Sequence, residues 1–196
     1  MRDRSSCHLP LLLIISLMLL AVACQRAPEF NGTLNPDPAP APDFELTGAG
    51  GQPVSVSDFT GEVVLLYFGY TFCPDVCPAT MSELRRMQEA VGDDGLQVLF
   101  VSVDPGRDTP EIAHAYAAGF HPAFIGVSGT PEEIAAAAAG WGVFYEAGEP
   151  DDRGNYAVDH TARVFVVDKA GDYRLSYPFA TPPEDIAADV EILLEE

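Results

Sequence analysis

Positive charge is scarce in this sequence. Only 10 Lys and Arg residues stand against 30 Asp and Glu residues, which gives a formal net charge of −20. Such a surface repels phosphate backbones, so we expect no nucleic-acid partner. The chain of 196 residues also lacks the length for several domains. Without a leader and a linker it has room for one domain of roughly 150 residues.

Long apolar runs are scarce as well. The longest covers residues 9–23, and Pro10 and Ser16 interrupt it. As a helix it would span only ~22 Å, less than the ~30 Å hydrocarbon core, which favours an export signal over a permanent membrane helix. It ends in Ala21-Val22-Ala23-Cys24, which resembles a bacterial lipobox and implies cleavage before Cys24 and acylation of its thiol. An uncleaved short anchor is the alternative. Either way, we expect the protein in the bacterial cell envelope, outside the cytoplasm and attached to a membrane.

Cysteine is the third scarce residue, with four in the chain. Cys7 leaves with the signal and Cys24 carries the lipid, so the exported domain keeps only Cys73 and Cys77. Two cysteines in an oxidising compartment commonly form a structural disulfide. A bridge across so short a loop, however, removes little entropy from the unfolded chain.

Three regions are predicted along the chain. Residues 1–23 form the signal, and residues 24–42 form a linker rich in proline, which we expect to be an extended spacer that holds the domain off the bilayer. Residues 43–196 form the domain.

The domain alternates short apolar runs with helical patterns, which predicts an α/β fold with a central sheet flanked by helices. Residues 63–69 are almost all apolar, as in a strand buried on both faces. Apolar residues three and four positions apart predict a helix over residues 78–91. The same reasoning predicts a strand at 98–103, helices beginning at 109–110 and 130–131, a hairpin over 162–177 and a last helix over 183–194.

Cys73 and Cys77 follow the central strand and stand at the start of a helix. The carboxyl end of such a strand is where ligand sites form in open α/β sheets. A helix N-terminus favours anions, so we expect both thiols to ionise below the free pKa of about 8.5. Their spacing of four places them about one helical turn apart on one side. Such a pair can hold one metal ion or exchange disulfides.

At these residues the chain resembles the Sco/SenC family. The likeness runs from residue 42 to the C-terminus and includes residues 104–110 and 158–161. It implies a membrane-tethered, thioredoxin-like domain whose central mixed β-sheet is flanked by helices, with an added C-terminal β-hairpin. It also implies that Cys73, Cys77 and His160 bind copper, and that the protein helps assemble the copper centre of cytochrome c oxidase. The implied partners are the oxidase subunit that bears copper and either a thiol reductant or another copper carrier. Family members often carry histidine where this chain has Phe72.

The residue types agree with that resemblance. Two thiolates and an imidazole form a soft ligand set that suits Cu(I), and Cu(II) would recruit a further ligand such as water. A structural zinc site would need a fourth protein ligand. His114 and His121 lie on or beside the helix after the second strand, where we expect surface or local capping roles.

Two enzymatic alternatives remain. A thiol-disulfide oxidoreductase would cycle Cys73 and Cys77 between dithiol and disulfide, but thioredoxin-like reductases normally use Cys-x-x-Cys and a cis-proline, and residues 159–163 contain no proline. A peroxidase would need threonine three residues before the reactive cysteine, where this chain has Tyr70. We therefore predict a metallochaperone without catalytic residues, and keep the oxidoreductase as the alternative.

Overall fold

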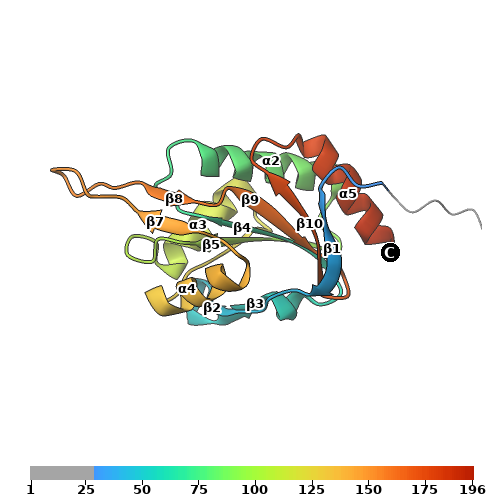
Figure 1. Ribbon diagram of the computed structural model, residues 1–196, viewed down its shortest axis with the longest axis horizontal. Helices are drawn as coiled ribbons and strands as arrows, with labels where there is room; N and C mark the ends of the chain where they lie inside the picture. Colours follow the sequence, from blue (N-terminus) through green and yellow to red (C-terminus); the bar gives the residue numbers. More distant parts are fainter. Residues whose placement is uncertain (1–28) are drawn as a thin grey trace, which may run out of the picture.

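The structure is a computed structural model that describes residues 29–196 (Figure 1). The predicted signal and the lipid acceptor Cys24 lie outside the described residues. Within 29–196, none of the helices has both the length and the apolar character needed to cross a membrane.

A six-stranded mixed sheet forms the centre of the domain, in the order β1-β10-β9-β4-β5-β6. Strands β4, β5 and β6 are parallel, whereas β9 runs antiparallel to β4, and β10 runs antiparallel to both β9 and β1. Their bounds are β1 Thr33–Pro40, β4 Val63–Gly69, β5 Leu96–Ser102, β6 Ile125–Val127, β9 Arg163–Val167 and β10 Asp172–Pro178. The predicted central mixed sheet with its hairpin of β9 and β10 is confirmed.

Helices cover the sheet. Helices α2 and α5 pack against each other along one side, and α4 lies on the opposite side with a ribbon of two short strands, β2 and β3 (Figure 1). Helix α3 packs against β6. Thr109 and Thr130 cap α3 and α4, each followed by proline, as the sequence predicts. The bounds are α2 Val76–Val91, α3 Pro110–Phe120, α4 Pro131–Gly140, α5 Pro183–Glu195, β2 Glu45–Thr47 and β3 Pro53–Ser55, with 3-10 turns at Ala49–Gly51 and Val56–Phe59.

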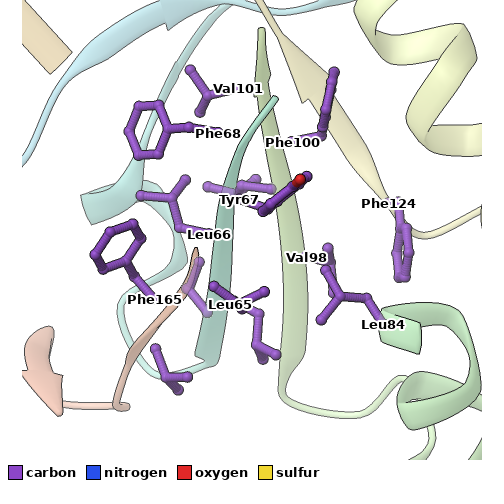
Figure 2. Packing of buried hydrophobic residues seen from close by; sticks show 14 of the residues in the cluster. Leu65, Leu66, Tyr67, Phe68, Leu84, Val98, Phe100, Val101, Phe124 and Phe165 are labelled. Atoms are coloured by element: carbon purple, nitrogen blue, oxygen red, sulfur yellow. The ribbon is translucent and has the colours of Figure 1, made fainter. Parts of the chain in front are cut away.

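Strand β4 runs through the core, and all seven of its residues are buried. Because side chains alternate along a strand, they pack against both layers. Phe68 meets Phe165 edge-on at 6.3 Å between ring centroids, while Tyr67 lies on the side of Leu84 from α2 (Figure 2). The predicted strand with two buried faces is confirmed, and it fixes where the following loop begins.

The proline-rich segment differs from the expected spacer, because residues 33–40 form β1 at the edge of the sheet. Thr33 pairs with Ser176 and Pro40 with Asp172, with a shift in register between Leu34 and Ala39. Proline cannot donate a hydrogen bond to a neighbouring strand, and an edge strand tolerates it because one side has no neighbour.

A second hairpin, outside the main sheet, was not predicted. Its strands are β7 (Tyr145–Ala147) and β8 (Val158–His160), which pair antiparallel with each other. It projects from one end of the molecule (Figure 1). His160 is the last residue of β8, so this hairpin carries the predicted histidine ligand.

Candidate metal centre

The cysteine loop begins where β4 ends. Gly69 ends the strand, and a side chain here would be crowded: a Cβ atom would lie 3.0 Å from the Tyr67 ring and 3.1 Å from the Cys77 sulfur. Glycine at this position therefore lets the sulfur approach the strand. Helix α2 begins at Val76, so Cys77 lies in its first turn and Cys73 lies in the loop before it.

The three predicted ligands converge. Their donor atoms, the two cysteine Sγ atoms and a nitrogen of His160, all lie within 4.8 Å of one another. The Cys77 sulfur is 3.3 Å from Nε2 of His160, and the backbone N–H of Cys77 donates to the Cys73 sulfur at 3.3 Å. His160 is distant from the cysteines in the sequence, so only the fold brings these atoms together.

The imidazole is oriented by its surroundings. Nδ1 of His160 lies 3.3 Å from the carbonyl oxygen of Thr161. Because a carbonyl only accepts hydrogen bonds, this contact places the ring proton on Nδ1 and leaves the Nε2 lone pair facing the sulfurs. The rings of Tyr67 and Tyr70 meet the imidazole edge-on, with centroids at 6.1 and 5.9 Å. Burial lowers the pKa of His160, which favours the neutral, metal-binding form.

The two thiols differ, contrary to the expectation that both ionise easily. Partial burial acts to raise the pKa of Cys73, but hydrogen bonds from the backbone N–H groups of Asp75 and Cys77 hold that pKa below its ordinary value. Burial raises the pKa of Cys77 to about 12. The helix N-terminus does not offset this, because the Cys77 side chain is fully buried against the core.

The donor set fits a soft ion of low coordination number. Within residues 29–196, the acidic, cysteine and histidine side chains close enough to share an ion are these three alone. A closed tetrahedral zinc site lacks its fourth protein ligand here, whereas two sulfurs and one nitrogen suit Cu(I). His114 and His121 stay outside the cluster; His114 accepts a hydrogen bond from the backbone N–H of Gly126 in β6, and His121 accepts one from the backbone N–H of Ala123.

Sequence reasoning gave no site role to residues 104–108, although it noted the segment. The buried Asp108 carboxylate accepts hydrogen bonds from the backbone N–H and the hydroxyl of Thr71, at 2.9 and 2.5 Å. It also accepts from the Ser102 hydroxyl at 2.6 Å. This anchor fixes the loop two residues before Cys73. A buried aspartate cannot be distinguished from an exposed turn residue in one sequence.

Comparison with known proteins gives a consistent result. A family model described as SCO1/SenC matches residues 33–195, which includes β1. The mitochondrial protein SCO2 homolog of Bos taurus is 36% identical over 152 residues, which cover 76% of this chain and 57% of the relative. A SCO2-like protein of Rickettsia felis is 33% identical over 147 residues, which cover 74% of this chain and 72% of the relative. The chain thus spans little more than half the length of the bovine protein.

Solved structures share the fold. Apo Sco1 of Thermus thermophilus superposes with a TM-score of 0.77 at 47% identity, over 85% of this chain and 98% of that one. ScoI of Bradyrhizobium japonicum, determined with copper bound, gives a TM-score of 0.72 at 36% identity, over 80% of this chain and all of that one (100%).

Proposed function

The chain belongs to the SCO1/SenC family, and we propose that it carries copper outside the bacterial cytoplasm and delivers it to the copper centre of cytochrome c oxidase. The observation that carries the proposal is the convergence of Cys73, Cys77 and His160 on one point. The copper bound to the Bradyrhizobium japonicum relative favours copper over another soft ion.

Each ligand has a distinct part in taking up the ion. Cys73 is half-buried and holds a lowered pKa, so it offers the first thiolate. Cys77 then loses its proton to solvent as its sulfur binds, and Nε2 of His160 completes a trigonal Cu(I) site. Cu(II) adds a water ligand. A pocket lined by Tyr70, Cys73 and His160 leaves the site open to a partner's thiolates, which take the ion by ligand exchange.

The proposed setting is the cell envelope. Acylated Cys24 anchors the chain to a membrane, and the acceptor is the oxidase subunit that bears copper. A thiol reductant or another copper carrier prepares the site, because copper binds only when both cysteines are reduced.

Copper binding is tested with the purified full-length chain, reduced and anaerobic. We expect one Cu(I) per chain, and no stoichiometric copper after His160→Ala and Cys77→Ser are combined. Arg85→Ala, on the exposed side of α2, serves as the control and retains the metal. Stoichiometric copper in the double variant would refute the site.

A second candidate function, thiol-disulfide exchange, is favoured by the inequality of the thiols. An accessible cysteine with a lowered pKa beside a buried partner with a raised one is the arrangement of an attacking and a resolving thiol. In this role Cys73 attacks a disulfide of the oxidase subunit, and Cys77 releases the product as Cys73 and Cys77 become a disulfide.

The two functions are separated by mixing experiments with the copper-binding fragment of the oxidase. Copper-loaded chain is added to the reduced fragment, and metal-free dithiol chain is added to the oxidised fragment. A copper carrier transfers its ion in the first mixture. If only the second mixture reacts, by reduction of the fragment's disulfide, the reductase function is correct.

A further inference from the structure

The candidate ligand His160 belongs to a hairpin whose strands do not pair with the main sheet. Strands β7 and β8 pair with each other, Tyr145 opposite His160, in a separate two-stranded sheet. The distance between the imidazole and the sulfurs therefore depends on contacts made outside any strand ladder.

Val158 is buried in the core and Tyr145 packs against it, and the side-chain hydrogen bonds of the hairpin centre on Tyr156, just before β8. Tyr156 makes two of the hydrogen bonds that join the hairpin to the rest of the described chain, and the backbone of Val158 adds a contact with the Tyr70 hydroxyl. The Tyr156 carbonyl oxygen accepts from Nη1 of Arg107 at 2.9 Å, and the Tyr156 hydroxyl donates to Asp104 at 2.7 Å. Nε of Arg107 donates to the same Asp104 carboxylate. Asp104, Arg107 and Tyr156 thus form a closed set, named here the Arg107 clamp.

The same guanidinium faces the cysteine loop. Its central carbon lies 3.6 Å from the ring centroid of Tyr156 and 4.9 Å from that of Phe72, the residue before Cys73. Asp108, next along the chain, holds Thr71 of that loop. One short segment, residues 104–108, therefore contacts both the cysteine loop and the hairpin that carries His160.

The chemistry of the clamp requires arginine. The Arg107 side chain is 17% exposed and that of Asp104 is 5% exposed. Nη2 of Arg107 is buried without a hydrogen-bond acceptor within residues 29–196, and the guanidinium as a whole lies over the rings of Tyr156 and Phe72. A lysine keeps the charge but has neither the planar fork nor the stacking surface.

We propose that the Arg107 clamp is the positioning element of the metal site: it sets the hairpin against the cysteine loop and thereby holds His160 at binding distance from the two sulfurs. The inference rests on the copper site proposed above. The clamp residues are not ligands, and they act through His160.

The test compares Cu(I) dissociation constants of the full-length chain, measured by competition with bicinchoninate. Arg107→Lys is expected to weaken binding about tenfold or more, the range typical of residues that orient a metal ligand. Tyr156→Phe keeps the ring, loses the hydroxyl contact with Asp104, and is expected to weaken binding by a smaller factor. Arg86→Lys, whose exposed side chain pairs with Glu83, is the matched control and binds as the unaltered chain does.

Each substitution is repeated in a His160→Ala background. Because the clamp acts through His160, its effect should shrink to less than about twofold there, which is the non-additivity of coupled residues. A loss of the same size without His160, or wild-type affinity in both clamp variants, would overturn the inference.

Hydrogen exchange of the metal-free chain gives a readout independent of copper. Arg107→Lys should speed exchange of amides in residues 145–160 and leave β9 unchanged; unaltered exchange in the hairpin would overturn the positioning role. If the unaltered chain binds no copper yet the hairpin loosens in the variant, the copper function fails while the clamp stands.

Discussion

At the scale of single residues, the pKa values of the two cysteines differ because Cys73 precedes the start of α2 and Cys77 lies in its first turn. The Cys73 sulfur lies in the loop and accepts hydrogen bonds from backbone N–H groups. The Cys77 side chain points into the core and contacts Gly69. A soft metal ion can overcome this difference, because binding replaces the proton on each sulfur.

The difference predicts unequal alkylation. In the reduced, metal-free chain at pH 8, iodoacetamide should modify Cys73 first, because its lowered pKa leaves more thiolate at a given pH. With a pKa of about 12, Cys77 holds only about one part in ten thousand as thiolate at that pH. Raising the pH should speed the reaction of Cys73 only up to its pKa and continue to speed that of Cys77 beyond it. Peptide mass spectrometry follows both rates.

Cys73→Ser is the control for that experiment, since it removes any shielding of Cys77 by a modified neighbour. Cys77 should remain slow in this variant. Equal labelling of the two cysteines in the unaltered chain would contradict the assigned pKa directions.

The three candidate ligands could be named from the sequence and its family resemblance, and the structure brings their donor atoms together, but their chemical properties could not be predicted. Cys73 and Cys77 are the thiols left after the predicted signal and the predicted lipid site are set aside, and their place after a buried strand is visible in the apolar pattern. The raised pKa of Cys77 follows from its complete burial, which depends on where α2 begins and on how it packs over β4. Those distances belong to the fold.

At the scale of elements, periodicity and capping residues predicted the helices and the central strands well, because each of these elements carries its signal within its own sequence. Strand β1 and the β7–β8 hairpin carry no such signal. Proline obscures β1, and β7 and β8 have three residues each, too few for a pattern. Strand β1 pairs with β10, which is distant in the sequence, and a long loop separates β7 from β8.

The packing of α3 on β6 gives a prediction from two glycines. A Cβ atom at Gly126 would lie only 2.1 Å from the carbonyl oxygen of Ala113, a backbone atom that cannot move aside. Gly119, on the exposed side of α3, has nothing within 4 Å of such an atom. Gly126→Ala should therefore lower the free energy of unfolding by about 3 kcal/mol or more, whereas Gly119→Ala should raise it by about 0.5–1 kcal/mol.

Urea denaturation of both glycine variants measures the two changes. The opposite signs make each variant a control for the other, since both exchange the same atoms. A tolerated alanine at Gly126 would mean that α3 and β6 are farther apart than the structure places them.

At the scale of the whole molecule, the domain has two structurally distinct ends. Strand β1 and the end of α5 lie at one end, and the β7–β8 hairpin lies at the other (Figure 1). The domain thus presents the metal site away from the end at which β1 enters the sheet. With the proposed anchor at Cys24, this arrangement would leave the site accessible to a partner.

The buried carboxylate of Asp189 holds the segment that leads into β1. Asp189 of α5 accepts hydrogen bonds from the backbone N–H groups of Asn31 and Gly32 at 2.9 and 2.8 Å and from the Tyr177 hydroxyl at 2.9 Å. Asp189→Ala should lower the free energy of unfolding by about 2–4 kcal/mol, because the buried tyrosine hydroxyl loses its acceptor. Chemical denaturation measures this loss.

The Asp189 variant should bind Cu(I) as tightly as the unaltered chain, because the clamp and the three ligands are untouched. Glu191→Ala, an exposed acidic residue on the same helix, is the control and should leave stability within about 0.5 kcal/mol. A comparable loss in the control would show that charge on α5, rather than the buried contact, supports the fold.

The most direct measurement is X-ray absorption at the copper edge of the Cu(I)-loaded chain. Two sulfur scatterers and one nitrogen scatterer should surround the ion, and the nitrogen should disappear in His160→Ala while both sulfurs remain. A first coordination sphere without two sulfurs, or one unchanged by His160→Ala, would contradict the site formed by Cys73, Cys77 and His160.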